Sequence, residues 1–250
     1  MRLERITNLT ASDGHNLPGL LVAPDGATSA VVLLPPYGAG KEVMLGLALA
    51  IGERGVASIS IDNCGHGENH FPIGASAYVD ETESAIAYAR NFYKRVAAGG
   101  ISLGGRLSLM SSADCMVAIS PAVVAEISPQ GKWMFENFPS PSVREPYSGY
   151  VNELLKELGP VKRHDRPCLL LYSERDIPMI LNGAKELHEL LPGSEVRHIT
   201  REIRPDVQHE SGIIRYLPRW FNHMELKFNL ECMEVTAKWL ASQQATARSA

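Results

Sequence analysis

The sequence predicts an α/β fold built on a mainly parallel central sheet with helices on both faces. Short apolar runs alternate with longer stretches of helical periodicity along most of the 250 residues. Several of these runs are apolar on both faces, which suits central strands of a covered parallel sheet. An alternation of strand, helix and strand predicts right-handed crossovers between parallel neighbours.

The expected strands and helices follow one another in a regular order. Central strands are predicted in the run that begins at Ala27, between Val56 and Ile61, and in "KRVAAGG", "DCMVAIS" and "RPCLLLY". Helices are predicted in "KEVMLGLALAIGERG", "ETESAIAYARNFYKR" and "ILNGAKELHELLPG". The first segments, joined by the turn signal Ser12-Asp13-Gly14, indicate an antiparallel hairpin at a sheet edge. The stretch "MELKFNLECMEVTAKWLASQ" has the apolar spacing of a terminal amphipathic helix.

The length favours a single domain, residues 1–250, with one insertion at 122–166. The insertion falls between the strand that ends near Ser120 and the strand that begins near Cys168. It mixes prolines and aromatic residues with one short helix, "YVNELLKELG". A long irregular segment in a compact domain usually has a role, such as covering a site.

Composition excludes several classes of partner. The formal net charge is −4 and the basic residues are dispersed, which argues against nucleic acid. No segment approaches the ~20 apolar residues that cross a bilayer, so we expect a soluble, cytoplasmic protein with no membrane partner. The four cysteines are far apart and form no C-x-x-C pair, so we expect free thiols, two of them on strands, and neither zinc nor disulfides. The oligomeric state is left open.

The stretch Gly100-Ile101-Ser102-Leu103-Gly104 is the most informative motif. It fits the pattern G-x-S-x-G, in which a serine occupies a sharp turn between a strand and a helix. The flanking glycines remove the Cβ atoms that would collide in such a turn. The pattern predicts that Ser102 is a nucleophile at the carboxyl end of a strand. Glycines that serve only packing are the alternative.

A nucleophilic serine needs a histidine base, and the histidine needs a carboxylate to hold its tautomer. Asp176 follows the apolar run "CLLLY", and His209 comes 33 residues later, which leaves room for a helix and a strand. Asp176 is preferred to Glu174 and to Asp165, although it could instead serve as a helix N-cap.

Seven other histidines compete with His209 for the role of base. Four of them fall in predicted strands, helices or the insertion, away from the carboxyl edge of the sheet: His15, His164, His188 and His198. His66 and His70 belong to a glycine-rich loop, and His223 opens the predicted terminal helix. We therefore expect His209 to be the base.

Taken together, these motifs resemble those of the α/β-hydrolase superfamily, and the resemblance spans almost the whole chain. "GGISLGG" is similar to its nucleophile elbow, "LLLYSERDIPM" to the segment of the triad acid, "IDNCGHGEN" to the D-x-x-G-H-G segment and "VVLLPPYGAGKE" to the oxyanion loop. The resemblance implies Ser102, Asp176 and His209 as a triad, with no metal or cofactor. It also implies the backbone N–H groups of Tyr37 and Leu103 as the oxyanion hole, where Pro36 has no N–H to give.

The resemblance further implies that the insertion is a small cap. Its aromatic residues, with Tyr37, are then expected to bind substrate: Trp133, Phe135 and Phe138. The function expected from these motifs is a carboxylesterase acting on a hydrophobic small ester through an acyl-enzyme. The same triad serves thioesterases, acyltransferases, dienelactone-type and C–C bond hydrolases and peptidases, and the fold also hosts binding proteins without turnover.

Overall fold

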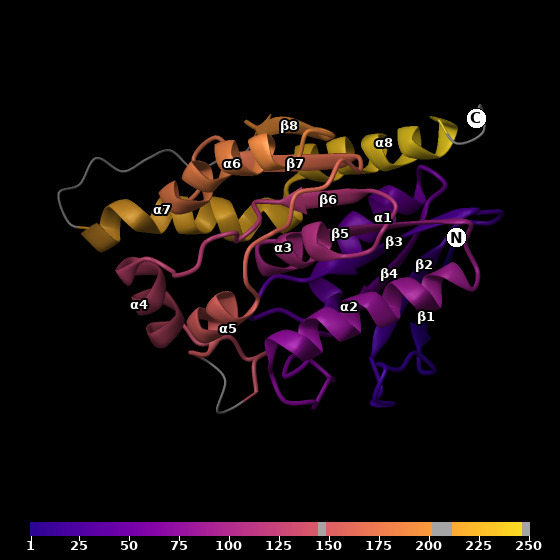
Figure 1. Ribbon diagram of the computed structural model, residues 1–250, viewed down its shortest axis with the longest axis horizontal. Coiled ribbons are helices and arrows are strands. Elements are labelled where there is room, and N and C mark those ends of the chain that lie inside the picture. The colour runs from indigo at the N-terminus through magenta and orange to yellow at the C-terminus, as the bar shows by residue number, and fades with distance from the viewer. Residues whose placement is uncertain (145–148, 202–211, 247–250) are drawn as a thin grey trace.

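One sheet of eight strands organises the part of the chain that the computed structural model describes, residues 1–144, 149–201 and 212–246 (Figure 1). Its order is β1-β2-β4-β3-β5-β6-β7-β8. The strands are β1 (Arg2–Ile6), β2 (Gly19–Ala23), β3 (Ser29–Leu34), β4 (Ala57–Ile61), β5 (Arg95–Ile101), β6 (Met116–Ile119), β7 (Cys168–Ser173) and β8 (Ser194–Ile199).

The expected hairpin and parallel sheet are both present. β1 pairs antiparallel with β2, and β2 with β4, at one edge of the sheet. All neighbours from β4 to β8 are parallel. The turn predicted at Ser12-Asp13-Gly14 closes a small bridge between Thr10 and Asn16, with Gly14 at φ +90°. The mainly parallel α/β prediction is therefore confirmed.

Helices cover both faces because the central strands are apolar on both. In β3, Val31 and Leu33 pack toward α1 (Leu45–Gly52) and α8 (Leu230–Thr246), whereas Val32 and Leu34 belong to the core on the opposite face. That second core contains side chains of α2 (Ala75–Arg90), α3 (Leu103–Met110) and α6 (Pro178–Leu190). Successive side chains of a strand point to opposite faces, so one uninterrupted apolar run serves both layers.

The insertion between β6 and β7 contains α4 (Pro129–Asn137) and α5 (Val151–Glu157). Only α5 was expected from the sequence. Ser128 caps α4 by accepting a hydrogen bond from the Gly131 N–H at 3.1 Å, and Pro129 stands in the first turn, where its missing N–H costs nothing. In Figure 1, α4, α5 and α7 (Gly212–Glu225) lie beyond the same end of the strands.

The segment before α8 differs from the prediction. The stretch from Gly212 to Glu225, for which no helix of its own was predicted, is helix α7 with Pro218 inside it. A short 3-10 turn, η2 (Leu226–Phe228), separates α7 from α8, and another, η1 (Lys41–Met44), precedes α1. His223 therefore lies in the last turn of α7, not at the start of the terminal helix.

All four cysteines are buried free thiols. Cys168 opens β7, but Cys115 precedes β6 by one residue, so only one of the two expected strand positions is met. Among the residues that the structure describes, no helix is both long and apolar enough to span a bilayer.

Candidate active site

Ser102 stands at the turn from β5 to α3 in a backbone conformation that L-residues rarely adopt. Its φ is 53° and its ψ is −113°. The two glycines of the motif are required sterically. A Cβ on Gly100 would lie 2.3 Å from the backbone of Gly104, and a Cβ on Gly104 would lie 2.0 Å from the carbonyl oxygen of Leu34. The turn thus forms only with glycine on both sides, and it holds Ser102 at the carboxyl end of the central strand β5.

Asp176 lies in the loop after β7, and its carboxylate is fully buried. Oδ1 accepts hydrogen bonds from the Ile177 N–H at 2.7 Å and from His223 Nδ1 at 2.9 Å. Oδ2 accepts from the hydroxyl of Ser120, another residue with positive φ, at 45°. A buried carboxylate needs such donors, because burying an unpaired charge is costly.

His223 is the histidine that contacts Asp176. It is 4% exposed and comes from α7, which is tied to the loop of Asp176 by two further bonds. The Arg219 guanidinium donates to the Asp176 carbonyl at 3.1 Å, and the Asn222 side chain donates to the Arg175 carbonyl at 3.2 Å. An ionised carboxylate only accepts, so Nδ1 carries the proton and Nε2 of the neutral ring keeps its lone pair.

His209, the base expected from the sequence, lies outside the described residues. Among the described residues it is His223 that contacts Asp176, which makes His223 the candidate base. The helical spacing in "RWFNHM" was the available signal: Trp220, His223 and Met224 share one face of a helix, and all three line the same cavity. Pro218 concealed it, because a proline usually ends a helix.

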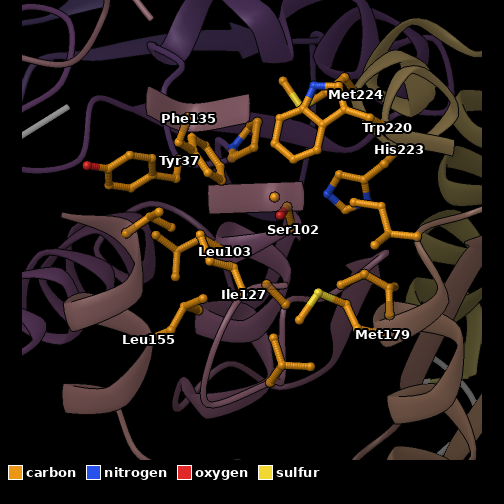
Figure 2. A pocket seen from close by; sticks show the side chains of 17 residues that line it. Tyr37, Ser102, Leu103, Ile127, Phe135, Leu155, Met179, Trp220, His223 and Met224 are labelled. Atoms are coloured by element: carbon orange, nitrogen blue, oxygen red, sulfur yellow. The ribbon is translucent and has the colours of Figure 1, made fainter. Parts of the chain in front are cut away.

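Ser102 and His223 line one cavity of about 50 Å³ (Figure 2). Figure 2 shows the His223 ring beside Ser102, with Phe135 and Trp220 above the serine in this view and Ile127, Leu155 and Met179 below it. Apart from Ser102 and His223 the lining side chains are almost all apolar. They come from the loop after β3, from the insertion and from α6 and α7.

The two residues expected to supply oxyanion donors, Tyr37 and Leu103, also line this cavity. Leu103 is the first residue of α3, where a backbone N–H has no intrahelical partner. Tyr37 is buried, its hydroxyl points away from Ser102 in Figure 2, and its ring meets His66 edge-on at 5.0 Å between ring centroids.

His66 is hydrogen-bonded to the loop that carries Tyr37. Its Nε2 accepts a hydrogen bond from the Gly38 N–H at 3.0 Å, and its Nδ1 donates to the Cys64 carbonyl at 2.9 Å. Burial lowers the pKa of His66, which keeps the ring neutral and able to accept at Nε2. The loop that carries Tyr37 is thereby held against the loop after β4.

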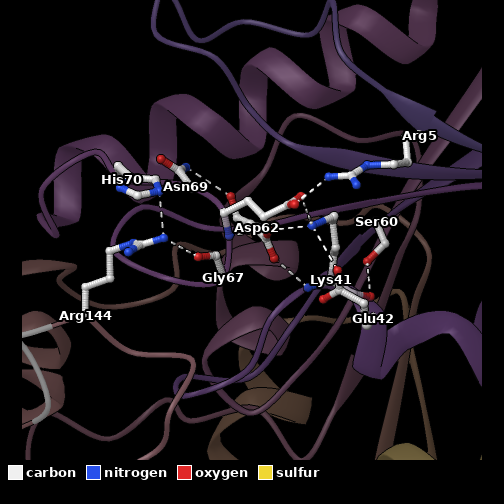
Figure 3. A network of polar contacts seen from close by, with 10 residues as sticks. Arg5, Lys41, Glu42, Ser60, Asp62, Gly67, Asn69, His70 and Arg144 are labelled. Atoms are coloured by element: carbon white, nitrogen blue, oxygen red, sulfur yellow. Dashed lines mark hydrogen bonds and ion pairs between the residues drawn. The ribbon is translucent and has the colours of Figure 1, made fainter.

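An ion-pair network centred on the buried Lys41 and Asp62 joins the same two loops at a second point (Figure 3). Lys41 is 1% exposed, and its Nζ contacts Asp62 at 2.7 Å and Glu68 at 2.8 Å. Its backbone N–H donates to the other Asp62 oxygen at 2.7 Å. Because both carboxylates follow β4 and Lys41 follows the Tyr37 loop, this network sets the distance between the loops.

The aromatic residues expected to bind substrate divide into two groups. Tyr37 and Phe135 line the cavity, and their rings meet edge-on at 5.8 Å. Trp133 does not: it is 42% exposed and packs against Phe138. Two residues along a helix lie about 200° apart, so α4 cannot turn both Trp133 and Phe135 inward. Phe138 is 61% exposed and lines a neighbouring hollow instead.

The described residues contain no group of three or more histidine, cysteine, aspartate or glutamate side chains that could hold a metal ion. The buried polar groups beside Ser102 are instead committed to one another, with His223 and Ser120 both bonded to Asp176. The arrangement can activate a hydroxyl through a histidine that a carboxylate orients.

Comparison with solved structures finds close matches in architecture at low sequence identity. An esterase from Pyrococcus furiosus superposes with a TM-score of 0.63 at 17% identity, over 91% of this chain and 89% of that one. An esterase from Pyrobaculum calidifontis gives 0.62 at 18% identity, over 97% and 85%. Est1E from Butyrivibrio proteoclasticus, solved with ferulic acid bound, gives 0.59 at 14% identity, over 84% and 95%. No protein-family model and no curated protein sequence matches this chain.

Proposed function

Because this chain has the α/β-hydrolase fold of these solved esterases, we propose that it is a serine carboxylesterase that acts through an acyl-enzyme. One observation carries the proposal. The strained serine of the elbow and a histidine bonded to a buried carboxylate line the same apolar cavity. Fold alone does not determine activity, whereas a serine, a histidine and a carboxylate in this arrangement provide a nucleophile and its base.

In the acylation step, Ser102 Oγ attacks the ester carbonyl carbon while His223 Nε2 takes the hydroxyl proton. Asp176 stabilises the imidazolium that forms. The tetrahedral oxyanion accepts hydrogen bonds from the N–H groups of Tyr37 and Leu103, and each donor of this kind contributes roughly 3 to 4 kcal/mol. The C–O bond to the alcohol then breaks, and His223 delivers the proton to the departing oxygen.

In the deacylation step, water takes the place of the alcohol. His223 removes a proton from the water, whose oxygen attacks the acyl carbon, and collapse of the second tetrahedral intermediate returns the proton to Ser102. The carboxylic acid is released. No metal or organic cofactor takes part in these steps.

The insertion at 122–166 acts as a lid over Ser102 in this proposal. Three of its apolar side chains, Ile127, Phe135 and Leu155, close the cavity on the side of α4 and α5. Its segment from Ser140 to Arg144 is bonded to the loops of the site: Ser140 donates to the Gly38 carbonyl, and the Arg144 N–H donates to the Gly65 carbonyl at 2.9 Å. These bonds couple the lid to the oxyanion loop and to the loop after β4.

The small apolar cavity favours esters with a short, uncharged group beside the scissile bond. A cavity of about 50 Å³ has room for only a few water-sized groups, since one water needs roughly 10 to 15 Å³. Peptide substrates would bring several polar groups into a wall that has almost no partners for them.

The decisive test combines a covalent probe with a panel of esters. The wild-type chain should be labelled by a fluorophosphonate and should hydrolyse 4-nitrophenyl acetate and butanoate, whereas Ser102→Ala should do neither and should keep the wild-type melting temperature. Acyl thioesters of the same acids, assayed in parallel, measure the preference for oxygen over sulfur esters.

Each outcome of this test has a definite meaning. The chain could be labelled and cleave thioesters rapidly, yet fail to hydrolyse oxygen esters. That result would identify a thioesterase and not a carboxylesterase. Absence of labelling in a folded wild-type chain would leave a binding protein and would refute the proposed function.

A further inference from the structure

A second hollow lies next to the Ser102 cavity and is larger, at about 320 Å³. We call it the outer hollow. Its lining comes from the Tyr37 loop, the insertion, α7 and η2: Tyr37, Gly38, Phe135, Phe138, Ser140, Val143, Trp220, Phe221, Met224 and Lys227. Neither the fold nor the proposed acyl transfer assigns it a role.

The two hollows share a wall of four side chains. Tyr37, Phe135, Trp220 and Met224 line both of them. The rings of Phe135 and Trp220 meet edge-on at 5.1 Å, and Figure 2 shows both residues beside Ser102. A molecule in the outer hollow would therefore contact the far side of the same residues that bound the scissile ester. The remote half of an ester held at Ser102 has this hollow as its nearest space.

The outer hollow has one charged lining group, the Lys227 ammonium, among the residues that the structure describes. Among the described residues of the lining there is no carboxylate. Among the uncharged polar side chains of the lining, Ser140 already donates its hydroxyl hydrogen to the Gly38 carbonyl. An anion would meet a cation and aromatic walls there, with no like charge among the lining residues that the structure describes.

Lys227 itself is partly buried and, within the described part of the chain, makes no ion pair. Its Nζ lies 5.3 Å from the centroid of the Phe228 ring, a weak cation–π contact. Burial lowers the pKa of the Lys227 ammonium, and the neighbouring Glu225 acts in the opposite direction. Within the described residues this partly buried ammonium has no carboxylate partner, and an anionic ligand would compensate the cost of burying it.

We propose that the outer hollow is a subsite for a carboxylate group on the remote half of the ester, with Lys227 as its partner. This proposal rests on the esterase activity proposed above. A single ammonium, with no arginine among the described lining residues, matches a monoanion, whereas a phosphate dianion would keep uncompensated charge in an apolar hollow. The substrate class is therefore an ester with a short group at Ser102 and a carboxylate several bonds away.

The test compares matched charged and neutral esters in two series. In the acyl series, 4-nitrophenyl hydrogen adipate is compared with 4-nitrophenyl methyl adipate. In the alcohol series, the acetate ester of 4-hydroxyphenylacetic acid is compared with that of 4-hydroxyphenylacetamide. In at least one series the wild-type chain should prefer the anion by roughly tenfold in kcat/KM, the scale of one charge-assisted hydrogen bond.

Substitutions at Lys227 identify the source of that preference. Lys227→Met keeps the length of the side chain and should reduce the ratio of anionic to neutral kcat/KM to one or below, whereas Lys227→Arg should retain most of it. Lys132→Met is the matched control. Lys132 is an exposed lysine of the insertion, on α4, and does not line the outer hollow. Its replacement therefore measures the non-specific attraction of anions to lysines of the surface.

Binding to Ser102→Ala separates the subsite from catalysis. Isothermal titration of this variant with the anionic and neutral esters should show the same preference, lost when Lys227→Met is added. If Ser102→Ala still hydrolyses esters, the proposed function is refuted. The difference in binding affinity between anionic and neutral esters still tests the subsite in that case. The subsite is refuted if neither series favours the anion, if Lys227→Met keeps the ratio, or if Lys132→Met removes it equally.

Discussion

His223 Nδ1 lies 2.9 Å from Asp176 Oδ1, and this bond joins α7 to the loop after β7 at the base of the Ser102 cavity. The Asp176 carboxylate is fully buried and takes three donors, so it is fixed in position before any substrate arrives. Such preorganisation holds the imidazole in one tautomer and one orientation. The two residues are 47 positions apart in sequence, so the path of the chain between them determines which histidine reaches the carboxylate.

Replacement of His223 should therefore remove activity, and replacement of His209 should not. We expect His223→Ala to lower kcat on 4-nitrophenyl acetate by at least roughly 10⁴-fold and Asp176→Asn to lower it by a similar factor, because members of a triad act as a unit. His209→Ala should retain kcat within about threefold. Circular dichroism checks that each variant is folded. Loss of activity in His209→Ala with normal activity in His223→Ala would restore His209 as the base.

The acid and the elbow could be read from local sequence because each depends on its immediate neighbours. Gly100 is forced by a contact within the turn, Gly104 completes the five-residue motif although its steric constraint comes from Leu34 of β3, and Asp176 lies three residues after a buried apolar strand. The base depends on tertiary structure. α7 contains Pro218, and its orientation is set by bonds from Arg219 and Asn222 to the loop of Asp176, none of which leaves a local pattern.

The insertion was likewise predicted only in part from the sequence. The position of the insertion between β6 and β7 follows from the order of apolar runs, but α4 was not expected among the prolines. Ser128 and Pro129 form a helix start that prolines elsewhere in the segment concealed. Without α4, the opposite orientations of Trp133 and Phe135 could not be derived, and both were expected at the pocket.

Two adjacent glycines of β5 test the steric account of the elbow. A Cβ on Gly100 would lie 2.3 Å from the Gly104 backbone, whereas a Cβ on Gly99 would meet only side-chain atoms at 3.4 Å or more. Overpacking costs about 1 to 3 kcal/mol, and each kcal/mol shifts the melting temperature of a chain of this size by roughly 2 to 4 °C. Differential scanning calorimetry should show a clear loss for Gly100→Ala and a shift within about 2 °C for Gly99→Ala. Equal shifts in the two variants would contradict the account.

The Glu68 carboxylate should make stability depend on pH in acid. Hydrogen bonds from Lys41, and then from Arg5, lower the pKa of Glu68 to about 2 in the folded chain, from about 4.5 in the unfolded one. A lowered folded pKa means that this contribution is complete above pH 4.5 and is lost as the pH falls through about 2. In urea titrations between pH 5 and pH 2, Glu68→Gln should show a shallower decline in the free energy of unfolding than the wild type. Glu53→Gln, at an exposed residue, is the control, and identical slopes in wild type and Glu68→Gln would disprove the coupling.

Phe135 should limit the length of the acyl group that the enzyme accepts. Its ring contacts both Tyr37 and Trp220 and closes the cavity at Ser102, so the wild-type kcat/KM on 4-nitrophenyl esters should be highest for short acyl chains and should fall once the cavity is filled. Phe135→Ala opens this wall toward the outer hollow. Each further CH₂ that finds apolar surface contributes about 0.8 kcal/mol, or roughly fourfold, so the optimum should move to longer chains by two or more carbons.

Trp133→Ala is the matched control for this prediction, since it removes a large aromatic side chain from the same helix on its exposed side. Its chain-length profile should coincide with that of the wild type, even if its melting temperature falls because the contact with Phe138 is lost. A shift of the optimum in Trp133→Ala but not in Phe135→Ala would mean that α4 turns its other face to the substrate in solution. A shift in both would show that the whole lid, and not one ring, sets the acyl limit.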